Sequence, residues 1–151
     1  MKKALFLSLF LAFVAILPSA AQRKIKAKDY VGVWQMEVTQ PNGEKVYPPY
    51  FKVIEKNGTY YTLMPPMGRL GTAPHRKFNV GTYKITGDNT VVEKFIGTDG
   101  PMAGKNLTSE IDCVISDDNR TMSVTFTDPS NHRRISERWV RIIFVWASTL
   151  E

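Results

Sequence analysis

The stretch Asp29–Thr39, DYVGVWQMEVT, decides the fold class of this 151-residue chain. Within it Trp34, Met36 and Val38 fall on one face of an extended strand, with polar residues between them. This alternation is typical of a β-strand that buries one face. The turn residues Pro41-Asn42-Gly43 follow directly and end the strand. The segment therefore predicts the first strand of an antiparallel sheet.

Seven more segments with the same character follow, and turn signals separate them. The predicted strands are Val31–Thr39, Tyr47–Ile54, Thr59–Met64, Phe78–Ile85, Thr90–Ile96, Asn106–Ser116, Thr121–Thr127 and Ile135–Ile143. An open sheet of eight strands would leave two exposed edges, and closing the sheet removes them. We therefore predict an all-β fold, an eight-stranded antiparallel up-and-down barrel. A two-sheet sandwich is the competing closure, but the tight turns argue against its long crossovers.

Short and long connections alternate along this predicted meander. Tight turns follow the second, fourth and sixth strands, whereas the loops Pro65–Lys77, Gly97–Lys105 and Asp128–Arg134 follow the third, fifth and seventh. Because successive connections in a meander lie at opposite ends, the long loops share one end. The sequence thus predicts a closed end and a mouth, where binding loops are usually found.

Two short motifs resemble a known family. Gly32-Val33-Trp34 resembles the Gly-x-Trp opening of lipocalins, and Trp139-Val140-Arg141 resembles their closing strand. The chain is similar to the lipocalin-like domains, in the calycin superfamily, of secreted bacterial proteins of uncharacterised function. This resemblance implies a barrel that binds a small apolar or amphipathic molecule. It also implies that Arg141 packs against Trp34, and we expect Trp34, Trp139 and Arg141 to form a structural plug.

Alternation from Trp34 predicts which side chains point into the barrel. They are Trp34, Met36, Val38, Phe51, Val53, Tyr61, Leu63, Ile111, Cys113, Met122, Val124, Phe126, Trp139, Arg141 and Ile143. Of these, the expected interior ligand contacts are Met36, Val38, Phe51, Tyr61, Leu63 and Phe126. We expect Cys113 to be a small buried core residue, since nothing in its neighbourhood lowers the pKa of a thiol.

The long loops carry six basic residues against two acidic ones, and both histidines. A mouth of one sign attracts ligands of the opposite sign. We therefore predict a small hydrophobic or amphipathic anion, with its apolar body inside and its acidic group at the rim. The expected mouth contacts are Met64, Met67, Arg69, His75, Arg76, Met102, Lys105, His132 and Arg133.

The first 21 residues predict a secretory signal peptide. Lys2 and Lys3 precede an apolar run, and Ser19 and Ala21 suit cleavage after Ala21. The run of Ala4–Leu17 would span roughly 21 Å as a helix, too short for a hydrocarbon core of about 30 Å. We expect a secreted or periplasmic protein with a solvated basic arm at 22–29, a barrel at 30–144 and a tail at 145–151.

Several functional classes are disfavoured. Removal of the signal lowers the net charge from +6 to +4, most of it in the arm, which argues against a nucleic-acid-binding domain. No motif for a hydrolase, a nucleotide site or a metal site is present, so we predict no cofactor, metal or catalytic residue. Two alternatives stay open. One is an interaction or inhibitor module with a filled barrel; the other is an enzyme using His75 and His132 with Glu110 or Glu137.

Overall fold

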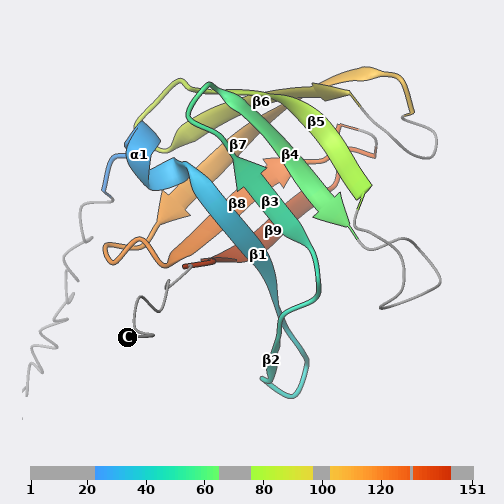
Figure 1. Cartoon of the computed structure of the whole chain (residues 1–151). Helices are drawn as coiled ribbons and strands as arrows, with labels where there is room; N and C mark the ends of the chain where they lie inside the picture. Colours follow the sequence, from blue (N-terminus) through green and yellow to red (C-terminus); the bar gives the residue numbers. More distant parts are fainter. Residues whose placement is uncertain (1–22, 65–75, 97–102, 130, 144–151) are drawn as a thin grey trace, which may run out of the picture.

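The computed structural model describes residues 23–64, 76–96, 103–129 and 131–143, which fold into a closed antiparallel β-barrel (Figure 1). Its elements are α1 (Ala27–Tyr30), β1 (Gly32–Thr39), β2 (Lys45–Val46), β3 (Phe51–Ile54), β4 (Thr59–Met64), β5 (Arg76–Ile85), β6 (Thr90–Ile96), β7 (Asn106–Ile115), β8 (Thr121–Thr127) and β9 (Arg134–Arg141).

The barrel closes between its first and last strands. Consecutive strands from β3 to β9 pair with one another, and β1 pairs with both β3 and β9. In the closing pair Trp34 lies opposite Arg141 and Met36 lies opposite Trp139. The predicted eight-stranded up-and-down barrel is confirmed, and its architecture is compatible with a lipocalin-like fold.

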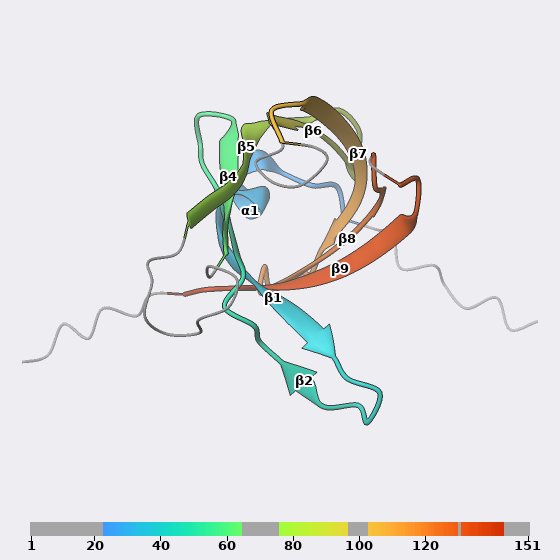
Figure 2. The same ribbon diagram turned by 90° about the vertical axis from the view of Figure 1, so that its right-hand side faces the viewer.

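The second predicted strand, Tyr47–Ile54, is corrected to Phe51–Ile54, and a separate two-residue strand, β2, precedes it. β2 pairs with the far end of β1 and β3 begins only at Phe51. Pro48 and Pro49 lie between them and have no backbone N–H to donate to a ladder. As a result β1 and β2 form a hairpin that projects beyond the barrel (Figure 2).

The segment before β1 covers the end of the barrel where the tight turns gather. Ile25 is buried, and its N–H donates to the carbonyl of Asp88 at 2.8 Å. Arg23 reaches the carbonyl of Asp117 and forms an ion pair with Asp29. Figure 2 shows α1 inside the outline of the barrel. The expectation of a solvated arm was therefore wrong for these residues, because Ile25 and Tyr30 supply apolar surface to the core.

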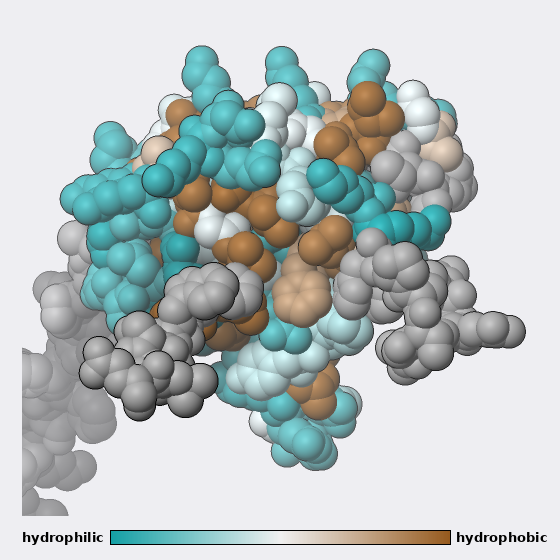
Figure 3. All heavy atoms as spheres, in the orientation of Figure 1, coloured by the Kyte–Doolittle hydropathy of each residue, from teal (hydrophilic) through white to brown (hydrophobic). Residues whose placement is uncertain are grey.

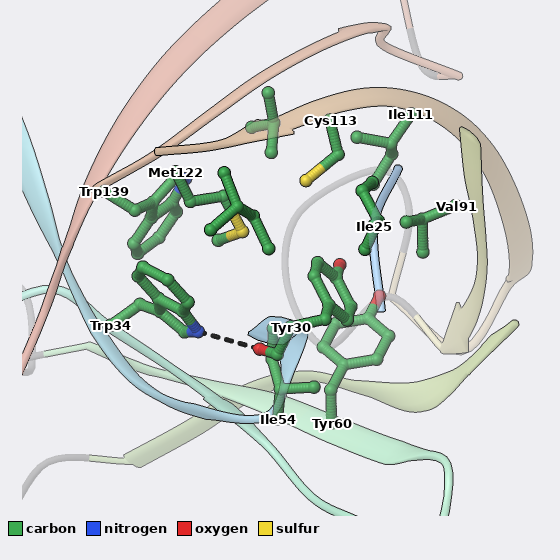
Figure 4. Packing of buried hydrophobic residues seen from close by; sticks show 12 residues of the cluster. Ile25, Tyr30, Trp34, Ile54, Tyr60, Val91, Ile111, Cys113, Met122 and Trp139 are labelled. Atoms are coloured by element: carbon green, nitrogen blue, oxygen red, sulfur yellow. Dashed lines mark hydrogen bonds between the residues drawn. The ribbon is translucent and has the colours of Figure 1, made fainter. Parts of the chain in front are cut away.

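The core lies in the half of the barrel next to α1 (Figure 4). Its buried members are Ile25, Tyr30, Trp34, Ile54, Tyr60, Val91, Ile111, Cys113, Ile115, Met122, Val124 and Trp139. The predicted inward placement of Ile111, Cys113, Met122 and Val124 is confirmed. The placement of Ile143 was wrong, since β9 ends at Arg141 and the side chain of Ile143 is 58% exposed.

The two faces of β3 and β4 are reversed relative to the prediction. Trp34 lies opposite Lys52, which in turn lies opposite Thr62, so these three side chains share the inner face. Ile54 and Tyr60 form the next inward pair. A shift of one residue in a strand moves every side chain to the other face.

Phe51, Val53, Tyr61 and Leu63 consequently point outward, and their predicted inward placement was wrong. Val33 lies opposite Val53, which lies opposite Tyr61, and Phe51 lies opposite Leu63. On β9, Val140 lies opposite Gln35 on the same outer face. The apolar outer stripe consists of Val33, Phe51, Val53, Tyr61, Leu63 and Val140, on β9, β1, β3 and β4. Of these strands, β1, β3 and β4 are in front in the view that Figure 3 shares with Figure 1.

Candidate binding site inside the barrel

The closed end is held by Arg141. Its Cζ lies 4.1 Å from the centre of the Trp34 ring, a cation–π contact. Its guanidinium donates to the backbone carbonyls of Asn119 and Val31, each at 2.7 Å, and to that of Asp29. The Trp34 indole N–H donates to the carbonyl of Tyr30 at 3.0 Å (Figure 4). This end of the barrel is therefore filled by side chains.

The backbone conformation and the surroundings of Gly32 explain why the first motif contains glycine. Its φ is +149°, a conformation that residues with a Cβ rarely adopt. A Cβ at this position would collide with Nη1 of Arg141. The glycine therefore makes room for the guanidinium that crosses above Trp34, and the two sequence motifs meet at one place.

A buried ion pair lies further along the barrel interior. Lys52 on β3 and Glu93 on β6 are 6% and 4% exposed, and Nζ of the lysine lies 2.5 Å from Oε1 of the glutamate. The hydroxyl of Tyr30 donates to the same oxygen at 2.8 Å. Nζ also lies 4.9 Å from the centre of the Tyr60 ring. Both charged groups lose hydration when they are buried, so this cluster has a large desolvation penalty.

A partly enclosed cavity of about 100 Å³ adjoins this ion pair. Its lining consists of Tyr50, Lys52, Tyr60, Thr62, Asn79, Glu93, Phe95, Ile111, Val124, Phe126, Glu137 and Trp139. At about 30 Å³ per water, the space holds roughly three water molecules. It is smaller than the roughly 300 Å³ that a drug-sized ligand needs, so a large apolar ligand does not fit in it.

Glu137 is the second carboxylate of this cavity. Glu137 lies two residues before Trp139 on β9, so both side chains point to the inner face of the barrel. Its Oε2 accepts a hydrogen bond from Trp139 Nε1 at 3.1 Å. Burial raises the pKa of Glu137, while the charge of Lys52 and the indole N–H oppose that rise. Burial, with the charge of Glu137 adding to it, raises the pKa of Tyr50 to about 12. The carboxyl group is therefore held in a dehydrated setting beside aromatic rings.

Sequence reasoning missed the polar members of this site. Alternation that turns Phe51, Val53, Tyr61 and Leu63 inward puts Lys52 and Thr62 on the outer face. The sequence suggests Glu137 only as a possible partner of His75 and His132, and no pattern in it points to Glu93. A usable signal existed on the last strand, since Glu137 shares the phase of Trp139 and Arg141 and therefore had to face inward.

The predicted interior contacts are divided between the two faces. Met36 and Phe126 pack against the core from the inner face, and Phe126 lines the cavity. Val38 is 41% exposed, beyond the point where β1 leaves β9. Phe51, Tyr61 and Leu63 lie on the outer stripe.

The predicted mouth contacts are only partly described. Arg76, Lys105, His132 and Arg133 are exposed and lie in or beside the long connections, and Met64 is half-buried at the end of β4. The remaining four, Met67, Arg69, His75 and Met102, lie outside the described residues, as do the predicted signal peptide and the tail from 145 onward. The predicted meeting of His75 with His132 is therefore not tested.

Three further observations concern the described residues. Cys113 is buried, as predicted, and burial raises its pKa to about 12. Within residues 23–64, 76–96, 103–129 and 131–143, no three His, Cys, Asp or Glu side chains gather as metal ligands. In the same residues, no helix has the length and apolar character needed to cross a membrane.

Comparison with known proteins places the chain in a family. No curated protein matches the sequence. Calycin membership stays a prediction, since the family evidence does not extend to that superfamily. Residues 29–146 match the family described as domain of unknown function DUF4488, and this span contains the whole barrel from β1 to β9. The chain therefore belongs to the DUF4488 family.

Proposed function

We propose that this chain is an exported binding protein that holds a small ligand in the inner cavity of the barrel. The observation that carries the proposal is the buried ion pair of Lys52 and Glu93, with the half-buried Glu137 beside it, around a cavity of about 100 Å³. Buried charges replaced by apolar groups of similar volume often leave a protein equally or more stable. A cavity whose lining includes titratable groups with shifted pKa values is thus a candidate for a binding site.

The size of the cavity limits the ligand. A small molecule, or one small polar group of a larger molecule, fits a space that holds roughly three waters. The exposed cations Arg76, Lys105 and Arg133 near the mouth support a ligand whose outer end is anionic. The predicted apolar body inside the barrel finds less support, because the lining includes the polar or charged residues Lys52, Thr62, Asn79, Glu93 and Glu137.

The interaction-module alternative draws on the apolar outer stripe. Its residues are half-buried at most, and nothing on that face identifies a partner. The cavity, by contrast, concentrates charged and aromatic groups around an interior space. Ligand binding therefore accounts for a costly feature that an interaction through the outer face leaves unexplained.

The test compares two variants that add the same bulk on opposite faces. Val124 is buried and lines the cavity, whereas Val114 on β7 is 39% exposed. Native mass spectrometry of the mature protein from its own host should show a retained small molecule, and thermal-shift screening of small metabolites should find binders. Val124→Phe should abolish this binding, and Val114→Phe should preserve it. Equal binding by both variants would reject the cavity as the site.

A further inference from the structure

We infer that the inner cavity recognises an organic ammonium group, which sits between the Glu137 carboxylate and the surrounding aromatic rings. This inference rests on the proposed function, because it names the chemical class of ligand for the same cavity. It differs from the anion expected from the basic loops, which concerned the mouth.

The charges of the cavity lining favour a cation. The lining contains two carboxylates, Glu93 and Glu137, and one ammonium, Lys52. Lys52 is committed to Glu93 at 2.5 Å, and in the described part of the chain no cation forms an ion pair with Glu137. An anion that entered would meet two carboxylates, whereas a cation would complete a second pair. In a setting of low dielectric this difference is large.

Aromatic rings surround the same space. Tyr50, Tyr60, Phe95, Phe126 and Trp139 all line the cavity. The rings of Tyr50 and Trp139 lie 6.3 Å apart between centroids and are tilted by 58°, so they form two walls rather than a stack. Ring faces attract cations, and aromatic cages are the recurrent solution for binding quaternary ammonium groups.

The protein already contains one ammonium in such a setting. Nζ of Lys52 is bonded to Glu93 and lies 4.9 Å from the centre of the Tyr60 ring. Glu137, with Tyr50 and Trp139 beside it, is a second carboxylate next to aromatic rings. The charge of Lys52 acts on it, but among the described residues no lysine forms an ion pair with it. This second carboxylate is therefore the one available to a ligand cation.

The indole of Trp139 positions the carboxylate for this role. Its N–H donates to Oε2 of Glu137 at 3.1 Å, and this is the hydrogen bond that the carboxylate accepts among the described residues. The other carboxylate oxygen has no partner there and is available to a ligand. Glu137 is half-buried, and a carboxylate that has lost part of its hydration and accepts one hydrogen bond gains from a cation, because pairing offsets that loss.

Isothermal titration calorimetry on the mature chain tests the inference with choline and tetramethylammonium as probes. The neutral isostere of choline, 3,3-dimethylbutan-1-ol, and the anion pivalate serve as comparisons. We expect both ammonium probes to bind, and the isostere and pivalate to bind about tenfold or more weakly. Equal binding of choline and its isostere would overturn the inference.

Variants at Glu137 provide the second arm. Glu137→Gln should weaken choline binding about tenfold or more, and Glu137→Asp, which keeps the charge, should retain part of it. Glu110→Gln removes an exposed carboxylate from the outer face of β7 and should leave binding unchanged. Circular dichroism confirms that each variant is folded. A Glu137→Gln protein that is folded and binds choline as the wild type does would contradict the inference.

The outcomes separate the inference from the proposed function. Binding of neutral or anionic molecules that Val124→Phe abolishes, without binding of either ammonium probe, would refute the inference and leave the proposed function standing. Binding that Val124→Phe does not affect would refute both.

Discussion

Replacing Lys52 by methionine removes the only cation that faces Glu93 across the described barrel interior. The two side chains are 6% and 4% exposed, and their charged atoms lie 2.5 Å apart. At an effective dielectric constant of about 20, the gross attraction at this distance is roughly 6–7 kcal/mol. Each ion, however, lost several kcal/mol of hydration when it was buried. The intact pair therefore changes the free energy of unfolding little, whereas removal of one partner lowers it strongly.

The size of the loss follows from this balance. Lys52→Met leaves a buried carboxylate that still accepts a hydrogen bond from the Tyr30 hydroxyl but has lost its cation, and should lower the free energy of unfolding by about 3–5 kcal/mol. The double variant Lys52→Met/Glu93→Gln keeps an acceptor for Tyr30 and carries no buried charge. The free energy of unfolding of this double variant should be within about 1–2 kcal/mol of the wild-type value.

Urea unfolding at pH 7, followed by far-UV circular dichroism, measures all three proteins. Lys94→Met is the matched control, since Lys94 is an exposed lysine on β6, and its effect should stay within about 0.5 kcal/mol. The reasoning fails if Lys52→Met costs less than about 1 kcal/mol, or if the double variant is no more stable than the single one.

Three further predictions concern other buried groups. Arg141→Lys should lower the free energy of unfolding by about 2–4 kcal/mol, since a lysine cannot both donate to three backbone carbonyls and stack on Trp34. Urea unfolding measures this loss, and a smaller loss would argue against the plug. Cys113 should not react with a disulfide reagent at pH 8 until urea unfolds the chain, because burial raises its pKa to about 12; fast labelling of native protein would contradict this. Burial raises the pKa of Glu137, which also faces Tyr50, Lys52 and Glu93, so ionisation of Glu137 is less favourable in the folded state than in the unfolded chain. Its contribution to stability is complete below the ordinary value of 4.5 and is lost as pH rises through the folded pKa, so the stability of wild type relative to Glu137→Gln should fall over that range in urea titrations.

The amino-acid sequence alone determined the architecture. Alternating apolar residues with turn signals specify eight short strands, and a meander of eight strands avoids exposed edges by closing. The distribution of short and long connections identified the closed end, and the two tryptophan motifs identified its plug. These features are local or depend on chain order, so they can be read without knowing the packing.

Only the tertiary structure decided what faces the interior on β3 and β4. Phe51-Lys52-Val53-Ile54 carries apolar residues on both faces, so alternation shows which side chains share a face but not which face turns inward. Pairing with β1 placed Lys52 beside Trp34, and closure of the barrel brought Glu93, 41 positions further along the chain, within 2.5 Å of it. A buried charge is tolerable only beside such a partner, and a contact between residues so distant in sequence exists only after the barrel has closed.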